Sequence, residues 1–342
     1  MQRINFFKIL ILIIATALSF IRCERVNEDF AGTYCLNLQN MEMIISQTGD
    51  LVTFSLNSGL IENGTGSISK DTLVLSATVS GTDTFAAKLV FPKDRQSFSG
   101  PYMILNDKGE MQMEGILLGN KGECPEHDIE VTGVPEFVEK DFTQLSKIDK
   151  ISKFRSGFGH SFTDGSEPCR SMKHYFNPYQ SYRQNNAVEI YSPVNGMIVS
   201  VANDGHGASA GLTNKEVQIK PDKYPAFVFV IYHCDLTSEA IVTGKRIEAG
   251  ELIGHARLYY DDLNEYATSF DIAVWVNTPS GMRLVSYFET MSDDLFNTYL
   301  LRGVTSRHDF IITKEDRDSS PLQCDGDTFL SEGSIENFVS LN

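Results

Sequence analysis

Short runs in which every second residue is apolar fill the first third of the chain and constrain its fold more than any other feature. Five such runs lie at 41–46, 51–56, 72–77, 85–91 and 111–118. Turn-forming residues separate them, for example Thr48-Gly49-Asp50. Alternation with a period of two places the apolar side chains on one face of a strand, and short strands joined by tight turns are typical of antiparallel meanders. We therefore predict an antiparallel barrel or sandwich over residues 23–124.

The remainder of the 342-residue chain is long enough for a second domain. A second set of β-type runs lies at 187–190, 196–202, 217–219, 226–233, 246–248 and 269–276. Between the two sets, residues 125–153 are predicted to form a linker with a short helix at 135–140. The C-terminal segment, 291–342, is predicted to begin with a helix at 293–301 and to end in a tail that folds back over the second domain. The predicted fold class is mostly β.

The N-terminus has the pattern of an export signal. Arg3 and Lys8 precede a run of 13 uncharged, mostly apolar residues. This run is shorter than the roughly 20 residues that cross a membrane, and it fits the apolar part of a secretory signal. We predict that residues 1–22 form a signal peptide. The sequence around Cys23 resembles a bacterial lipoprotein cleavage site, with Arg22 in place of the usual small residue, so Cys23 is a candidate for lipidation.

The chain has six cysteines and no CxxC pair, which argues against a zinc knuckle built from thiolates. Export to an oxidising compartment makes disulfides available. Cys35 and Cys124 bracket the first domain, and Cys169 and Cys324 bracket the second, so we predict one disulfide within each pair. Cys234 lies in an apolar run and is expected to be a buried free thiol.

The candidate chemistry begins with His160 and Asp164, which are four residues apart. Imidazole and carboxylate groups at this spacing can both face one divalent ion. Further along, an apolar run ends in His233, a glycine-rich turn follows over 242–254, and the last β-type run begins with Ser269-Phe270-Asp271.

This succession resembles the lysostaphin/LytM-type zinc endopeptidases, which cleave peptide cross-links in bacterial cell walls. The resemblance covers residues 154–290 and implies a LytM-like β-sheet core domain. It implies that His160 and Asp164 correspond to two zinc ligands, and that His233 corresponds to a catalytic histidine at a strand end. The family's glycine turn corresponds to Gly244, Gly250, Ile253 and Gly254.

The sequence departs from the family at its closing HxH motif. Ala267 and Ser269 stand in place of the two histidines, one catalytic and one the third zinc ligand. A catalytic zinc ion normally holds three protein ligands and a water molecule. The resemblance therefore implies a degenerate site without a cofactor.

Three further residues near these motifs have both a functional and a structural interpretation. His174 and His255 are candidate substitutes for the third zinc ligand, although a hydrogen-bonded structural role is expected for His174 and an exposed position for His255. Asp271 is expected to face the groove and to form an ion pair with Arg257 or Lys245.

Three functions are open on these grounds. The first is an exported, non-catalytic protein of the periplasm or cell surface that binds a peptidoglycan peptide or an envelope protein. The second is an active zinc endopeptidase whose third ligand is His174 or His255. The third is small-ligand binding by the N-terminal barrel, because its opening residues, 30–34, resemble those of small lipocalin-like barrels. A net charge of −16 without a basic stripe argues against a nucleic-acid partner, and membrane contact is expected only through a lipid on Cys23.

Overall fold

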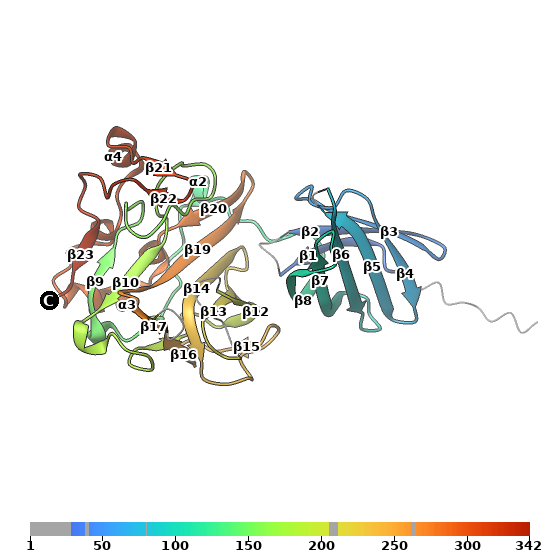
Figure 1. Ribbon diagram of the computed structural model, residues 1–342, viewed down its shortest axis with the longest axis horizontal. Helices are drawn as coiled ribbons and strands as arrows, with labels where there is room; N and C mark the ends of the chain where they lie inside the picture. The colour runs from blue at the N-terminus through green and yellow to red at the C-terminus, as the bar shows by residue number, and fades with distance from the viewer. Residues whose placement is uncertain (1–28, 38–40, 80, 205–210, 261–263) are drawn as a thin grey trace, which may run out of the picture.

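The structure is a computed structural model that describes residues 29–37, 41–79, 81–204, 211–260 and 264–342. The predicted signal peptide and Cys23 lie outside the described residues. Figure 1 shows a β-barrel formed by the first part of the chain and a larger, β-rich second part. The prediction of a mostly β chain with an N-terminal barrel or sandwich is confirmed, and the barrel is the form observed.

The first domain is a closed barrel of eight antiparallel strands, because β1 pairs with both β2 and β8. The strands are β1 (Gly32–Leu36), β2 (Glu42–Thr48), β3 (Leu51–Leu56), β4 (Gly64–Ser69), β5 (Thr72–Val79), β6 (Asp83–Val90), β7 (Ser97–Leu105) and β8 (Met111–Lys121). In β5 the apolar residues at 73, 75, 77 and 79 are buried, and the residues between them are exposed. The interior is filled by side chains that include seven aromatic rings: Phe30, Tyr34, Phe54, Phe85, Phe91, Phe98 and Tyr102.

The second domain is built on an eleven-stranded sheet, whose main path runs β15-β12-β13-β14-β19-β10-β9-β23. Its strands are β9 (Ile148–Ser152), β10 (His174–Pro178), β11 (Glu189–Tyr191), β12 (Gly196–Asn203), β13 (Lys215–Pro221), β14 (Phe227–Leu236), β15 (Arg246–Ile247), β16 (Leu252–Ala256), β19 (Phe270–Thr278), β20 (Gly281–Val285) and β23 (Phe338–Ser340). Two small ribbons complete the β structure: β17 (Tyr259–Tyr260) with β18 (Glu265–Tyr266), and β21 (Cys324–Asp325) with β22 (Thr328–Phe329).

The two faces of this sheet bury different clusters. In β14, Phe227, Phe229 and Ile231 join the main core, which also contains Phe296 and Tyr299 of helix α3 (Asp293–Leu300). The alternate residues of the same strand, at 228, 230 and 232, join a smaller cluster on the opposite face. This is the period-2 alternation expected of a strand that is covered on both sides. The smaller cluster forms the floor of the candidate site.

The segment that was expected to be a linker packs largely into the second domain. Its only described α-helix is α2 (Ile129–Thr132), and the helix predicted at 135–140 is wrong. The backbone N–H of Phe137 and that of Val138 both donate to the carbonyl of Thr290, at 2.8 and 2.9 Å, and both side chains are buried in the main core. Tertiary contacts therefore override the local helical pattern here.

The glycine-rich turn predicted over 242–254 connects β14 to β16 by way of β15. Gly250 has φ +83°, in the region that residues with a Cβ rarely adopt. Gly254 pairs closely with β14, and a Cβ at this position would stand 2.5 Å from the Sγ of Cys234. Two of the glycines that the resemblance singled out are thus required by backbone geometry and close packing.

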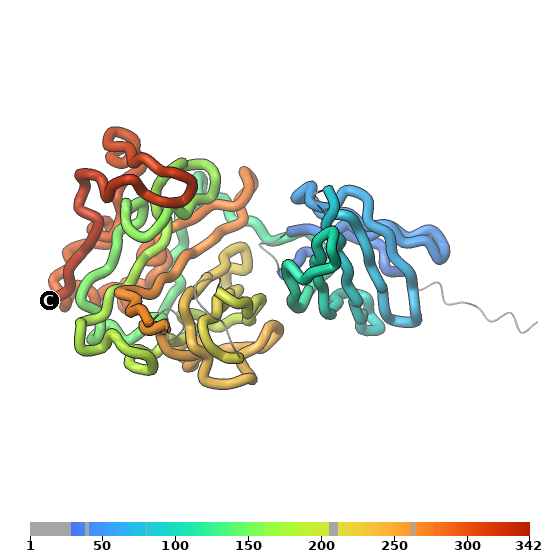
Figure 2. Tube along the Cα trace, in the orientation of Figure 1, coloured from blue at the N-terminus to red at the C-terminus, as the bar shows by residue number. Residues whose placement is uncertain are grey.

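Both predicted disulfides are present: Cys35–Cys124 and Cys169–Cys324, with Cα–Cα distances of 4.7 and 5.7 Å. Cys234 is a buried free cysteine, as predicted. The second disulfide links the C-terminal tail covalently to the segment around Cys169. This tail contains helix α4 (Lys314–Ser319) and, near its end, strand β23, which pairs with β9. Figure 2 shows this tail (red) passing close to the segment that carries His160 (green), and the N–H of Ser161 donates to the carbonyl of Asp327 at 2.6 Å. No helix within the described residues is both long and apolar enough to cross a bilayer.

Candidate functional site

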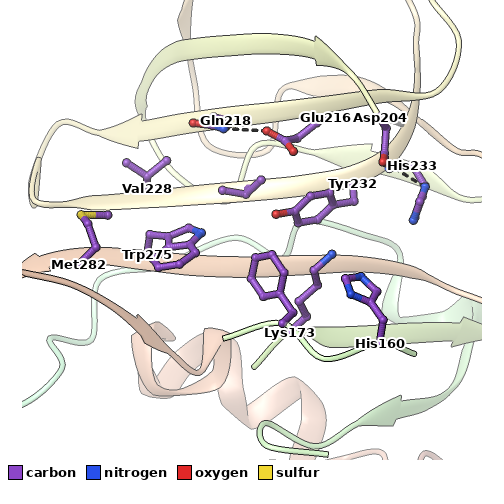
Figure 3. Close-up of a pocket in the computed structure, with 12 residues that line it drawn as sticks. His160, Lys173, Asp204, Glu216, Gln218, Val228, Tyr232, His233, Trp275 and Met282 are labelled. Atoms are coloured by element: carbon purple, nitrogen blue, oxygen red, sulfur yellow. Dashed lines mark hydrogen bonds and ion pairs between the residues drawn. The ribbon is translucent and has the colours of Figure 1, made fainter. Parts of the chain in front are cut away.

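A cavity of about 340 Å³ lies on the face of the sheet that carries the smaller cluster. Figure 3 shows β13 and β14 on one side of it, and His160 and Lys173 on the other. Charged or polar, aromatic and aliphatic groups all contribute to its wall. The lining residues are His160, Phe162, Lys173, Asp204, Glu216, Gln218, Val228, Val230, Tyr232, His233, Trp275 and Met282.

Strand alternation explains most of this lining. Val217 and Ile219 of β13 point into the main core, so Glu216 and Gln218 point to the cavity side. In β19, Val274 and Val276 belong to the main core, and Trp275 packs against the smaller cluster. Period-2 geometry thus collects polar and aromatic groups from separate strands on one surface.

His233 reaches the cavity by breaking this alternation. Tyr232 already faces the cavity, so a regular strand would turn the next residue toward the main core. Instead the pairing of β13 with β14 shifts register between Lys215 and Val217, and His233 has φ +55°. As a result Cys234, rather than His233, joins the main core. Such a bulge re-aims a side chain and is common beside functional sites, and the left-handed backbone costs about 1–2 kcal/mol.

Asp204 and Tyr260 hold the ring of His233. One oxygen of Asp204 accepts from the backbone N–H of His233 at 2.7 Å and lies 2.9 Å from its Nδ1. The hydroxyl of Tyr260 lies 3.0 Å from the same nitrogen. Burial alone would lower the pKa of His233, but the hydrogen bond to Asp204 and the charge of Asp271 outweigh it and raise the pKa. The site therefore favours the imidazolium.

Lys173 and Asp271 form a buried ion pair beside the cavity. The Nζ of Lys173 lies 2.8 Å from Oδ2 of Asp271, and the two side chains are 5% and 1% exposed. The ammonium also lies 3.6 Å from the ring centroid of Tyr232 and 4.4 Å from that of Phe162, within the range of cation–π attraction. The Nε2 of His233 lies 3.3 Å from the other oxygen of Asp271. The prediction that Asp271 pairs with Arg257 or Lys245 is therefore wrong.

The partners expected for Asp271 lie elsewhere in the domain. Arg257 pairs with Asp235 at 3.3 Å, and Lys245 pairs with Glu251. One residue of each pair adjoins β16: Glu251 directly precedes this strand, and Arg257 directly follows it. Lys173, in contrast, directly precedes β10, which is the strand paired with β19. The pairing of β10 with β19 therefore places Lys173 beside Asp271, although the two residues are far apart in the sequence.

His160 lines the cavity close to Lys173 (Figure 3). Its Nδ1 lies 3.2 Å from the carbonyl of its neighbour, Ser161. Burial, followed by the positive charge of Lys173, lowers the pKa of His160. The imidazole is therefore held neutral next to a cation that belongs to the protein itself.

Asp164 accepts hydrogen bonds from two backbone N–H groups. Its Oδ1 accepts from the N–H of Ser166 at 2.9 Å, and its Oδ2 accepts from the N–H of Leu284 in β20 at 2.9 Å. It is not among the residues that line the cavity. The carboxylate thus links a turn to strand β20 through backbone hydrogen bonds.

The two candidate substitute ligands also lie apart from the cavity. His174 is 1% exposed, with its Nδ1 2.8 Å from the carbonyl of Ser152 and its Nε2 2.8 Å from the hydroxyl of Ser286. Burial lowers its pKa to about 4. His255 is half-buried in β16, opposite Asp235 of β14. Both ring nitrogens of His174 are thus engaged in structural hydrogen bonds.

The donor set at the cavity does not fit a catalytic zinc ion. Such an ion needs three converging protein ligands, and within the described ranges no group of three His, Cys, Asp or Glu residues could hold a metal. The ammonium of Lys173 contacts Asp271 and repels charge at His160. A dication placed between these two groups would meet a fixed positive charge.

Sequence reasoning missed several residues that build this cavity. These residues, none of them among the candidates of the sequence analysis, are Lys173, Glu216, Gln218 and Trp275. The signal that could have found Gln218 and Trp275 is alternation, because each is flanked by two residues of the main core in a β-type run. Glu216 has one such neighbour, Val217, and Lys173 has none. Asp204 follows β12 and had no such signal.

Comparison with known proteins gives a limited likeness. No family model and no curated protein matches the sequence. Two solved structures of Helicobacter pylori Csd3, from an orthorhombic and a hexagonal crystal, are similar to this chain at 13% sequence identity and a TM-score of 0.30. Each similarity covers 74% of this chain, and 50% or 49% of the Csd3 chain. This chain therefore spans about half the length of the solved chains that it matches.

Proposed function

We propose that this chain is an exported, non-catalytic protein whose second domain binds a peptide segment of the bacterial cell wall in the cavity described above. The order of the sequence motifs supports the link to cell-wall peptides. The observation that carries the non-catalytic part is the Lys173–Asp271 ion pair, which places a lysine ammonium among the groups that would have to hold a metal.

The remaining groups of the cavity are suited to recognition. Hydrolysis of a peptide needs an activated water and stabilisation of the developing negative charge. Asp271 is occupied by Lys173, and Asp204 by the backbone and ring of His233. The aromatic rings of Phe162, Tyr232 and Trp275 remain as contact surfaces for a bound chain, beside the charged and polar groups of the same wall.

The test is co-sedimentation of the purified chain with isolated peptidoglycan, together with a turbidity assay for wall lysis. We expect the chain to sediment with the walls without reducing their turbidity. A Trp275→Ala variant should sediment less, while the matched control Phe338→Ala, which alters a ring in the tail, should behave like the wild type. Lysis that disappears in a His160→Ala variant would establish the enzyme instead, and failure to sediment would remove wall binding.

A further inference from the structure

The β13 side of the cavity carries a carboxylate, Glu216, that forms no ion pair with the described residues. Figure 3 shows Glu216 and Gln218 on β13, across the cavity from Lys173 and His160. The Nε2 of Gln218 donates to Oε1 of Glu216 at 2.7 Å. In the part of the chain that the structure describes, no lysine, arginine or histidine forms an ion pair with Glu216. Burial raises the pKa of Glu216, and the negative charge of Asp204 adds to this rise, whereas the hydrogen bond from Gln218 and the positive charge of Lys173 act against it.

The other acids around the cavity are already balanced. Asp271 has Lys173 at 2.8 Å, and Asp204 has His233 at 2.9 Å. Among the described residues of the cavity wall, three carboxylates thus face two cationic partners, and Glu216 is the one for which no ion pair is found. A partly buried carboxylate of this kind is stabilised by an incoming positive charge.

The walls of the cavity already hold one ammonium group. Lys173 lies over the rings of Tyr232 and Phe162, at 3.6 and 4.4 Å from their centroids. The ring of Trp275 continues this wall, with its centroid 5.9 Å from that of Phe162. Aromatic faces next to a carboxylate are the usual surroundings of a bound organic cation.

We propose that the cavity binds a primary ammonium group on an unbranched aliphatic chain. The ammonium pairs with Glu216 and hydrogen-bonds to the amide oxygen of Gln218, and the aliphatic chain packs along Val228, Trp275 and Met282, which line the same cavity. This proposal rests on the proposed function, because it names the group that the bound peptide presents to the site.

The intrinsic tryptophan fluorescence of the chain reports on this site, because Trp275 is its only tryptophan and lines the cavity. The probe is Nα-acetyl-lysine methylamide, titrated while tryptophan fluorescence is followed. The control ligand is Nα-acetyl-norleucine methylamide, which has the same aliphatic chain without the ammonium. We expect saturable binding of the lysine probe, and binding of the norleucine probe weaker by at least about tenfold, which corresponds to the loss of one charge-assisted contact.

Variants then locate the contact. Glu216→Gln should weaken binding of the lysine probe by about tenfold or more and leave that of the norleucine probe unchanged. The matched control is Glu315→Gln on the exposed surface of α4, which should bind both probes like the wild type. Equal binding of the two probes by the wild-type chain would overturn the proposal without any variant, and so would full binding of the lysine probe by a folded Glu216→Gln protein.

The outcomes also separate this proposal from the proposed function. Sedimentation with walls that survives Glu216→Gln, with no binding of the lysine probe, would refute the ammonium site and leave wall binding intact. Binding of the lysine probe without sedimentation would support the ammonium site and refute wall binding.

Discussion

Lys173 holds its ammonium among side chains that could otherwise contribute to a metal site. Removing two opposite charges from water is costly, and their attraction repays this only when the pair stays together. Lys173 and Asp271 are both almost completely buried. Each therefore depends on the other, and together the two add no net charge to the cavity.

Lys173→Met should lower the free energy of unfolding by about 3–5 kcal/mol, because it removes the nearer cationic partner of the buried Asp271 and leaves only His233, whose Nε2 lies 3.3 Å from the carboxylate. The double variant Lys173→Met/Asp271→Leu should recover most of this loss, since neither charge remains. Denaturant unfolding at pH 7 measures both. The control is Lys314→Met, which breaks the exposed pair with Asp318 and should leave stability nearly unchanged. A double variant as unstable as the single one would contradict this account of the pair.

The pH dependence of stability tests the environment of His233. A raised folded-state pKa stabilises the fold below the unfolded-state value of about 6.5, and this contribution is lost as the pH rises through the folded-state pKa. The stability that His233→Gln removes should therefore be larger at pH 6 than at pH 8.5. Denaturant unfolding at several pH values checks this.

His174 provides the contrasting case for that measurement. Its pKa is lowered to about 4, so the wild-type chain should lose stability relative to His174→Gln as the pH falls below about 6.5. The two variants must therefore show opposite trends with pH. Parallel trends would mean that the surroundings of His233 do not favour its charged form.

At the scale of elements, alternation made the strands predictable. The run at 51–56 is β3 in full, the run at 72–77 is part of β5, and the run at 226–233 overlaps β14 from residue 227 onward. β7 was missed because Pro101 and Gly100 interrupt its pattern, although the barrel tolerates both. The bulge at His233 could not be read from the sequence either, because it depends on the register between β13 and β14.

The candidate site was predictable only in part, for a related reason. The resemblance singled out His160 and His233, and both line the cavity. Asp164 is not among the residues that line the cavity. One of its oxygens accepts a hydrogen bond from the backbone N–H of Leu284, 120 residues away, and no local pattern in the sequence predicts that contact. The role of Lys173 depends on β10 lying beside β19, and strand neighbours that are distant in sequence leave no local signal.

The segment between the two domains provides a prediction at the element scale. Phe142, Ile148 and Ile151 are fully buried in the main core of the second domain, and β9 is a strand of its sheet. A fragment 125–342 should therefore fold, whereas 154–342 should not, since it leaves a large part of the core uncovered. Amide dispersion in NMR spectra and cooperative thermal unfolding distinguish the two. A cooperatively folded 154–342 fragment would show that the segment is only a linker.

At the scale of the whole molecule, a packed barrel and a larger sheet domain are joined in one chain, and each contains one disulfide. The barrel interior is filled with aromatic rings, whereas the second domain has a cavity with buried charges on its wall. The contrast between the filled barrel and the cavity of the second domain is in line with the proposal that the second domain binds the ligand. Small-ligand binding by the barrel stays a prediction.

The central claim is that the cavity is built around a lysine ammonium and does not hold a catalytic zinc ion. Equilibrium dialysis of the purified chain against zinc, followed by metal analysis, tests it most directly. We expect well below one zinc ion per chain, with no further decrease in a His160→Ala variant. About one tightly held zinc ion per wild-type chain, lost in His160→Ala, would contradict the claim.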